Sequence, residues 1–491
     1  MTTLTLPTIN YLALAPFLVM AGMALVLLIA TALTPSRIST RVATSAAVAA
    51  AGSALVITIV QGWQIARHGA QLTAAHSVVM DGFSALATAS ISSSLIFALL
   101  IAHDWEGRER FVGAEYQMLA LLATSGAVLM TEANDLAVVF LGLEILSIAL
   151  YVIIAFNRRR LKSQESSLKY FLLGGFAAAV FMYGAALVYG ATGTTNLTSI
   201  SYFLGANVLV HPGLLWAGGG LMMLAFAFKT QAVPFHFWSP DVYEGAPTPV
   251  TGFHASIVWG GAFAAAIRVM VSGLGTQSDT WRPIIWGLIV LSTVVGALFA
   301  ITQVNAKRLL AYSSVTHSGF IWLGVWAATA RGVAASVFYI LTYAPTVLGS
   351  FAIVALVGGV GDSDHYLVKY RGLARRNPWV GGSLALLLLS QLGVPFTVGF
   401  DGKFAVLAAS LDAGNVTASV VAMLAAAVAA FAYLRWVASL FAEGDPDVAP
   451  LVVPWASRVV IASSVVIVLV FGIWPAPLTH LAQHATLYFQ P

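Results

Sequence analysis

The chain has 491 residues, of which 59% are hydrophobic and only 9% charged, and this balance excludes a water-soluble domain, which carries roughly 25% charged residues. The formal net charge of +4 does not indicate a nucleic-acid partner, because the basic residues stand singly or in small groups between apolar blocks. The sequence contains no cysteine, which excludes disulfides, thiolate metal sites and Cys-bound iron–sulfur clusters.

Apolar blocks follow one another along the whole chain. A membrane-spanning helix needs about 20 mostly apolar residues, and such blocks lie at 11–33, 42–62, 79–101, 115–132, 135–156, 169–191, 213–238, 249–273, 284–302, 308–330, 333–359, 379–411, 415–441 and 456–475. The sequence therefore predicts an all-α polytopic membrane protein with about fourteen transmembrane helices. The first block lacks the features of a cleaved secretory signal, so we expect it to remain as the first helix.

Basic residues alternate between the two sides of the predicted helices. One side holds Arg37, Arg41, Arg108, Arg110, Arg158, Arg159, Arg160, Lys162, Lys169, Lys307, Arg308, Lys369, Arg371, Arg375, Arg376, Arg435 and Arg458. The other side holds only Arg67, Arg268, Arg282 and Arg331. Because loops rich in Lys and Arg stay in the cytoplasm, we expect the first side to be cytoplasmic and both termini to lie on the outer side.

Two pairs of lysine and proline suggest an internal repeat. The seventh block holds Lys229 with Pro234, and the twelfth holds Pro395 with Lys403. Five blocks separate these pairs, so we expect two inverted five-helix repeats, formed by helices 4–8 and 9–13, each with a broken helix. The predicted division is 1–114 for the first three helices, 115–273 and 284–441 for the repeats, and 442–491 for the last helix.

Four ionisable residues within the blocks stand out: Glu144, Lys229, His317 and Lys403. A charged residue costs about 2.5 to 3.5 kcal/mol at the centre of a membrane helix, so such groups usually face a bundle interior and have a function. A carboxylate that approaches a buried lysine favours its charged form. Glu144 and Lys229 could therefore act as a proton relay.

Each of these residues also has a structural interpretation. Glu144 could form only an ion pair with a neighbouring lysine, and Lys229 could snorkel to the interface. Lys403 could be an interfacial lysine paired with Asp401. His317 could be a hydrogen-bonded core residue, although its ordinary pKa suits proton transfer.

The segment PFHFWSPDVYEGAPTPVTGF, residues 234–253, is rich in proline for a link between two spans. His236 and Glu244 lack metal-site spacing, and a rigid turn after a broken helix explains the prolines better. Lys169 opens the sixth block behind a basic loop and by position alone is an interface anchor. No nucleotide-binding motif is present, so energy must come from a partner or an ion gradient.

The segments LGLEILSIALYVIIAF, ESSLKYFLLGG, KTQAVPFHFWSPDVYEGAPTPVTGF, KRLLAYSSVTHSGF and GVPFTVGFDGKF stand in this order between about residues 80 and 440. They resemble the subunit N family of the bacterial proton-translocating NADH-quinone oxidoreductase, respiratory complex I. The resemblance implies an antiporter-like, proton-moving subunit of the membrane arm in the bacterial cytoplasmic membrane. It implies sibling antiporter-like subunits and the lipid bilayer as partners, and no cofactor in this chain. FMN, iron–sulfur clusters, NADH and quinone belong to partner subunits.

The resemblance also assigns roles to single residues. Glu144 matches the glutamate of the fifth helix and Lys229 the lysine of the seventh, whose separation modulates proton affinity. Lys169 matches a lysine at the start of the sixth helix. Lys403 matches the twelfth-helix lysine on the exit side, and His317 matches a position where histidine is usual.

One position departs from the family pattern. The eighth helix usually carries a lysine where this chain has Trp259, which cannot titrate. The nearest ionisable residue is His254, about 7.5 Å along the axis and roughly 140° round a regular helix. We expect His254, with water, to carry the central step. The alternatives are that Lys229 and water suffice, or that the subunit has lost pumping and serves as a scaffold.

Three other functions compete with this interpretation. A cation/proton antiporter subunit has the same fold and buried lysines, although the DVYEGAPTPVT segment favours subunit N. A membrane subunit of a related hydrogenase or ferredoxin-linked complex remains open, because the electron donor binds elsewhere. A structural anchor that conducts nothing would gain little from costly buried charges.

Overall fold

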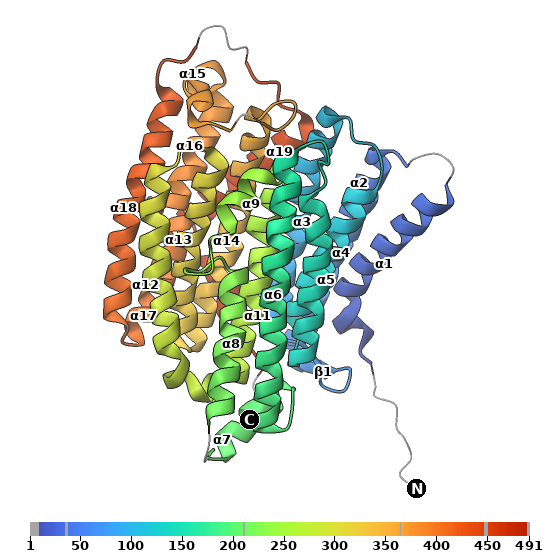
Figure 1. Ribbon diagram of the computed structural model, residues 1–491, viewed down its shortest axis with the longest axis vertical. Coiled ribbons are helices and arrows are strands. Elements are labelled where there is room, and N and C mark those ends of the chain that lie inside the picture. Colours follow the sequence, from blue (N-terminus) through green and yellow to red (C-terminus); the bar gives the residue numbers. More distant parts are fainter. Residues whose placement is uncertain (1–8, 35–37, 210–211, 364, 446–449, 489–491) are drawn as a thin grey trace.

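The computed structural model describes residues 9–34, 38–209, 212–363, 365–445 and 450–488, and helices dominate it (Figure 1). The first half contains α1 (Tyr11–Leu33), α2 (Thr40–His68), α3 (Gly82–Glu109), α4 (Glu115–Glu132), α5 (Leu136–Ile154), α6 (Leu161–Thr192), α7 (Leu197–Ala206), α8 (Gly213–Lys229) and α9 (Ser239–Gly245). A short antiparallel hairpin of β1 (Gln71–Thr73) and β2 (Val78–Met80) joins α2 to α3.

The eighth predicted span is not a regular α-helix. It consists of α10 (Thr248–Phe253), the π-helix η1 (His254–Val258), α11 (Trp259–Ile267) and the π-helix η2 (Arg268–Gly273). The angle predicted between His254 and Trp259 from a regular helix is therefore wrong, because a π turn holds more residues than an α turn. π-helices are rare and frequently occur at functional sites.

The second half of the chain is also mainly helical. They are η3 (Gly275–Gln277), α12 (Ser278–Thr302), α13 (Ala306–Ala327), α14 (Ala330–Val357), η4 (Leu367–Tyr370), α15 (Leu373–Arg376), α16 (Pro378–Leu392), α17 (Val398–Asp412), α18 (Val416–Phe441), α19 (Trp455–Ile473) and α20 (Ala476–Gln483). Within the described ranges, ten helices are long and apolar enough to cross a membrane by themselves. The other predicted spans hold α4, α8, α13, and α16 with α17. The polytopic all-α fold is confirmed, and the total of about fourteen spans stays a prediction.

Both predicted broken helices are present. α8 ends at Lys229, and the stretch before α9 includes Gln231 with a left-handed φ of 61°. α16 ends at Leu392 and is followed by Gly393, with a φ of 90°. A Cβ on Gly393 would lie 2.9 Å from Cδ of Lys403. Glycine is needed here both for the turn and for the approach of the lysine.

The two ends of the bundle differ in charge. The α5–α6 loop, η4 and α15 gather at the upper end in Figure 1 and hold many of the basic residues predicted to be cytoplasmic; Arg37 lies outside the described residues. We name this the basic end. The β1–β2 hairpin, α7 and α20 lie at the opposite end. The broken pairs α8–α9 and α16–α17 run in opposite directions between the two ends (Figure 1).

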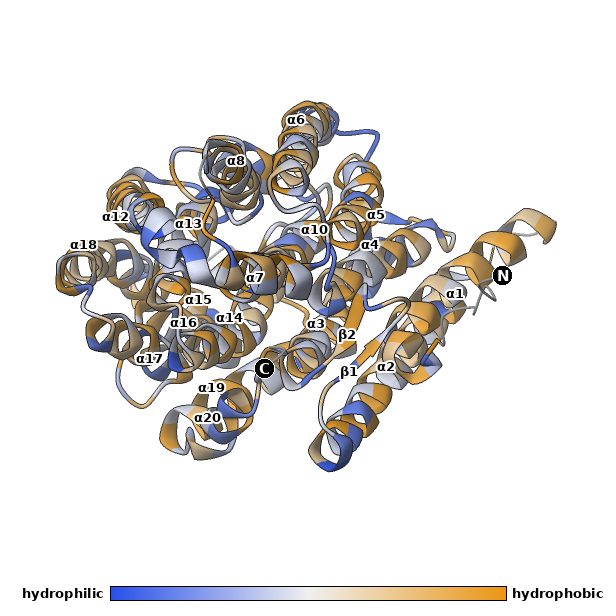
Figure 2. Cartoon of the chain, turned by 90° about the horizontal axis from the view of Figure 1, so that it is seen from below, coloured by the Kyte–Doolittle hydropathy of each residue, from blue (hydrophilic) through white to orange (hydrophobic). Residues whose placement is uncertain are grey.

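Small residues hold helix pairs together inside an apolar exterior. A Cβ on Gly126 of α4 would lie 2.5 Å from the carbonyl oxygen of Gly142 in α5. A Cβ on Gly184 of α6 would lie 2.7 Å from that of Gly218 in α8. Such close backbone packing stabilises helix pairs in lipid, where apolar surfaces gain nothing by association. Hydrophobic residues, orange in Figure 2, occur along most of the helices, and many large hydrophobic side chains are exposed.

Candidate functional site

Lys229 lies at the first break, in the centre of a hydroxyl cluster. Its side chain is buried, and Nζ donates hydrogen bonds to Oγ of Ser147 at 2.8 Å and to Oη of Tyr170 at 3.3 Å. Nζ also lies 5.0 Å from the centroid of the Tyr170 ring. α8 ends at this residue, so the lysine points across to α5 and α6 rather than along its own helix. It does not snorkel to an interface.

Glu144 lies one turn before Ser147 on α5, on a face that points out of the chain. Its neighbours on that face, Leu141 and Ile148, are 53% and 58% exposed. Oε1 of Glu144 is buried without a hydrogen-bond partner among the described residues. Glu144 acts on Lys229 through its charge, whereas Ser147 makes the hydrogen bond.

His254 stands at the first position of η1 and is buried. Its Nε2 lies 3.3 Å from Oη of Tyr170, the same hydroxyl that accepts from Lys229. Its Nδ1 lies 3.4 Å from Nε2 of Gln231 and 3.5 Å from Oη of Tyr243. Lys229 and His254 thus both contact the hydroxyl of Tyr170.

Trp259 fills the position where the family pattern has a lysine. Its ring packs against Phe263 at 4.9 Å and Tyr343 at 4.7 Å between centroids. Beside this ring, the hydroxyl groups of Ser314 and Tyr343 form a hydrogen bond at 2.8 Å. Residue 259 therefore has no titratable side chain, but hydroxyl groups lie beside its ring.

His317 lies beyond this point in α13. Its Nδ1 lies 2.6 Å from Oη of Tyr339, and its Nε2 lies 3.4 Å from Oη of Tyr433. The ring packs 4.6 Å from that of Tyr343. A cavity of about 10 Å³ borders His317 and the second break at Gly399, which is room for about one water molecule.

Lys403 occupies the second break. Nζ donates to the carbonyl oxygen of Leu392 at 2.7 Å, a group that the end of α16 leaves free, and lies 5.1 Å from the Phe320 ring. Asp401 is not its partner, since Oδ2 of Asp401 has no hydrogen-bond partner in the described part of the chain. We name the following set the polar row: Ser147, Lys229, Tyr170, His254, Tyr243, Ser314, Tyr343, His317 and Lys403. Hydrogen bonds join its members from Ser147 to Tyr243 and join Ser314 to Tyr343, and His317 packs on the Tyr343 ring.

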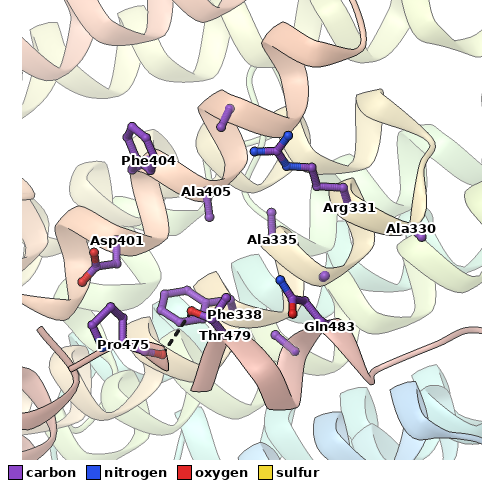
Figure 3. Close-up of a pocket in the computed structure, with 13 residues that line it drawn as sticks. Ala330, Arg331, Ala335, Phe338, Asp401, Phe404, Ala405, Pro475, Thr479 and Gln483 are labelled. Carbon is purple, nitrogen blue, oxygen red and sulfur yellow. Dashed lines mark hydrogen bonds between the residues drawn. The ribbon is translucent and has the colours of Figure 1, made fainter. Parts of the chain in front are cut away.

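Asp401 faces a separate cavity of about 480 Å³ between α14, α17 and α20 (Figure 3). Its lining is mainly alanine and phenylalanine, with Asp401 and Arg331 well apart (Figure 3). Arg331 pairs with Asp412. No residue of the polar row lines this cavity. We therefore do not assign the functional site to it, although it is large.

Lys169 precedes Tyr170 of the polar row, but its side chain takes part in the ion pairs of the basic end. Its Nζ pairs with Glu165 at 2.6 Å and Asp241 at 3.0 Å, and 41% of its side chain is exposed. Arg308 of α13 pairs with Asp241 at 2.7 Å and with Glu244 at 3.1 Å. Burial raises the pKa of Asp241, but hydrogen bonds from Arg308 and Lys169 outweigh it and hold that pKa below its usual range.

The sequence did not predict the ion pairs that Asp241 and Glu244 of α9 form, because their partners come from distant segments. It also missed a buried cluster in which Asp362 accepts hydrogen bonds from the backbone N–H and hydroxyl of Thr248 at 2.7 and 2.6 Å. Lys307 lies 3.8 Å from Asp362 and donates to the carbonyl oxygen of Ala246. These contacts join the two predicted repeats at the basic end.

The tyrosine and serine members of the polar row were also missed. They stand in the motifs quoted for the resemblance, but hydroxyl groups are common in membrane helices and carry no charge signal. Three or more His, Cys, Asp or Glu side chains grouped as metal ligands do not occur among the described residues.

A family model described as NADH:quinone oxidoreductase/Mrp antiporter, TM, matches residues 133–429. The chain belongs to this family. The matched range contains all six residues predicted as functional: Glu144, Lys169, Lys229, His254, His317 and Lys403.

Relatives within the family agree over the whole chain. NADH-quinone oxidoreductase subunit N of Mycobacterium tuberculosis (strain ATCC 25618 / H37Rv) is 43% identical over 374 residues, which cover 75% of this chain and 70% of that protein. Subunit N of Salinispora arenicola (strain CNS-205) is 37% identical over 519 residues, covering 99% of each. A chain of respiratory complex I from Thermus thermophilus with bound Aureothin has a TM-score of 0.81 at 32% identity, over 95% of this chain and 99% of that one. The predicted resemblance is confirmed.

Proposed function

We propose that this chain is a membrane-arm subunit of an NADH-quinone oxidoreductase and translocates protons, coupled to electron transfer from NADH to quinone in partner subunits. The polar row is the observation that carries this function. Hydrogen bonds join its members from Lys229 to Tyr243, and His317 and Lys403 extend the set to the second broken helix. The names and high coverage of the relatives support the choice of complex.

Within the proposed function, Lys229 is the first proton carrier. A change in the charge or position of Glu144 alters how well Lys229 holds its proton, because a nearby carboxylate favours the ammonium form. The proton then passes through Tyr170 to His254, which takes the central role in place of the family's lysine. The two 3.3 Å contacts of the Tyr170 hydroxyl support this step.

The later part of the path runs through His317 to Lys403, which releases the proton at the second break. The contacts of His317 with Tyr339 and Tyr433 and its cavity for about one water support this order. Lys169 has a different role: its exposed position in the ion pairs of the basic end fits proton uptake rather than a place in the polar row.

The outward position of Glu144 supports a neighbouring membrane subunit on the α5–α6 face. A carboxylate facing lipid at this depth costs about 2.5 to 3.5 kcal/mol, and a partner helix with a cation or hydrogen-bond donor would remove that cost. The apolar side chains around it, such as Leu141 and Ile148, supply surface for such a helix. FMN and iron–sulfur clusters belong to partner subunits in this proposal.

Residues 115–273 and 284–441 form the two inverted repeats of the proposed transporter. The opposite directions of the two broken helices support this division (Figure 1). The basic end is cytoplasmic by the positive-inside rule, which places both termini outside in the bacterial cytoplasmic membrane.

The test replaces the chromosomal copy with Lys229→Met and measures NADH-driven proton uptake by inverted membrane vesicles. Lys369→Met, at an exposed lysine of the basic end, is the matched control. We expect fewer protons pumped per NADH for Lys229→Met and no change for the control, at equal amounts of assembled complex. Unchanged pumping by Lys229→Met would refute the proton-carrying role.

Purification tests the assignment to the complex. A tagged chain extracted in mild detergent should bring flavin, iron–sulfur signals and inhibitor-sensitive NADH:quinone activity with it. The family also includes Mrp antiporters. Sodium-dependent proton exchange by membranes without NADH oxidation, together with a preparation free of redox centres, would favour that second function.

A further inference from the structure

A buried ion pair lies at the opposite end of the bundle, far from the basic end. Asp81 precedes α3 and Arg268 opens η2, and each side chain is 1% exposed. Nη1 and Nη2 of Arg268 donate to the two oxygens of Asp81, both at 2.9 Å. The backbone N–H groups of Ser84 and Tyr488 donate to the same oxygens at 2.8 and 2.9 Å. Asp81 is thus a fully bonded, charged carboxylate.

Glu132, the last residue of α4, adds a second carboxyl group beside this pair. It is 2% exposed, and Oε2 is buried with no hydrogen-bond partner in the described ranges. Arg268 is adjacent, since its Nε donates to the carbonyl oxygen of Thr131 at 2.9 Å. Arg268 and Asp81 are the charged groups that act on Glu132. Asp81 already balances the guanidinium, so an ionised Glu132 would be an uncompensated buried charge.

A structural interpretation accounts for the pair but not for Glu132. A bidentate arginine–aspartate bridge can join α3 to the eighth span by itself. Glu132 gives that bridge no hydrogen bond and would add a negative charge if ionised. A buried polar group without a partner in the protein requires an explanation. A carboxyl group that holds a proton at rest and exchanges it is such an explanation.

Hydroxyl groups lead from this cluster towards the polar row. Ser84, Thr88 and Ser92 recur every four residues on one face of α3, which extends about 12 Å. The hydroxyl of Thr88 lies 2.9 Å from that of Thr131, next to Glu132. Oγ of Ser92 is buried without a partner among the described residues. All of these hydroxyls are at most 2% exposed.

The two helices that carry this hydroxyl track also contact η1. Both α3 and α4 contact η1, which carries His254 at its first position. A Cβ on Gly261 of α11 would lie 3.0 Å from Cβ of Ala127 in α4, so α4 and the eighth span are in close backbone contact further along. The same span thus carries His254 in one π-helix and Arg268 in the other, about 20 Å apart along its axis.

The C-terminal segment separates the cluster from a cavity at the surface of the opposite end. The carbonyl oxygen of Thr486 accepts from the backbone N–H of Phe83, and that of Tyr488 accepts from Ser272 at 3.3 Å. On the other side of this segment, a cavity of about 540 Å³ is bordered by Thr486 and by Val271 of η2. The segment that bonds Asp81 and Ser272 thus also borders this cavity.

We propose that Glu132 is a proton-release residue of the first repeat, fed from the His254 region through the α3–α4 hydroxyl track and open to the outer side beneath the C-terminal segment. This inference rests on the proposed proton translocation. The step moves one proton: the O–H bond of the Glu132 carboxyl breaks, water accepts the proton, and the carboxylate takes a new proton from the track. No redox partner is involved.

The test compares two buried glutamates that are equally covered. Glu132→Gln keeps the size and hydrogen-bonding capacity of the side chain but cannot release a proton. The matched control is Glu106→Gln, because Glu106 is also 2% exposed but lies at the basic end of α3, where it accepts a hydrogen bond from Gln117 at 2.7 Å. Inverted vesicles are assayed for protons pumped per NADH, and native gels measure assembled complex.

With normal assembly, we expect Glu132→Gln to lower the pumping ratio below the wild type but not to the level of Lys229→Met, because the route through Lys403 remains. Glu106→Gln should match the wild type, and Glu132→Asp should recover part of the loss. A wild-type ratio in Glu132→Gln, while Lys229→Met is impaired, would overturn the inference and leave the proposed function standing. A wild-type ratio in both variants would instead overturn the proposed function. If Glu132→Gln does not assemble, an equal failure of Glu132→Asp would show that the carboxyl is structural.

Discussion

Removal of one hydroxyl group should interrupt the polar row between its two best-defined members. Oη of Tyr170 lies 3.3 Å from both Nζ of Lys229 and Nε2 of His254. Tyr170→Phe deletes this oxygen and leaves the ring, which packs on Trp238 at 4.8 Å. The substitution therefore removes the hydroxyl that contacts both side chains, while the packing of the ring is kept.

The cost to folding should be modest. A neutral hydrogen bond contributes about 0.5–1.5 kcal/mol and one to a charged group about 1.5–3 kcal/mol, which is less than a typical unfolding free energy of about 5–15 kcal/mol. The complex should therefore assemble. The loss of a proton relay, in contrast, should lower the protons pumped per NADH to the level of Lys229→Met.

Inverted vesicles with a pH-sensitive dye measure this ratio, and native gels measure assembly. The matched control is Tyr189→Phe, the same substitution on the same helix at a side chain that is 53% exposed. It should leave pumping unchanged. A full pumping ratio in Tyr170→Phe would refute the path through Tyr170.

Three further predictions follow from the site. His254→Phe should stop pumping through this subunit and leave assembly intact; an unchanged number of protons per NADH would show that Lys229 and water suffice. Gly393→Ala should destabilise the second break by about 1–2 kcal/mol, the cost of a left-handed conformation, and lower the melting temperature of the purified complex, whereas Gly382→Ala, where a Cβ meets nothing within 4 Å, should not. The depressed pKa of Asp241 means that its ion pairs stabilise the fold above the ordinary carboxyl pKa of about 4, and that this stabilisation is lost as pH falls below it. Arg308→Gln should therefore lower the melting temperature at pH 7 more than at pH 3. Equal losses of melting temperature at both pH values would contradict this prediction.

The broken helices and buried lysines could be predicted because their signals are local. Pro234 and Pro395 stand within a few residues of Lys229 and Lys403, and a charge in an apolar block is visible in any short window. The same locality explains the spans, since apolar length alone defines them. The structure places breaks at both predicted sites.

The connections between these charges could not be predicted in the same way. Tyr170 and His254 are separated by 84 residues and Asp81 and Arg268 by 187, so only the packing of helices brings them together. The two π-helices were missed because no residue type reports them; they change where His254 points relative to Trp259. Lys169 looked like a site residue by resemblance, but its contacts are with the charges of the basic end.

Two glycine contacts each hold a pair of helices together within residues 115–273. Gly126 and Gly142 lock α4 to α5, and Gly184 and Gly218 lock α6 to α8. Lys229 and Tyr170 belong to the α6–α8 pair, whereas Glu144 and Ser147 belong to the α4–α5 pair. A sliding motion between the two helix pairs would therefore lengthen the contact of Lys229 with Ser147, whereas the contact of Lys229 with Tyr170 would keep its length.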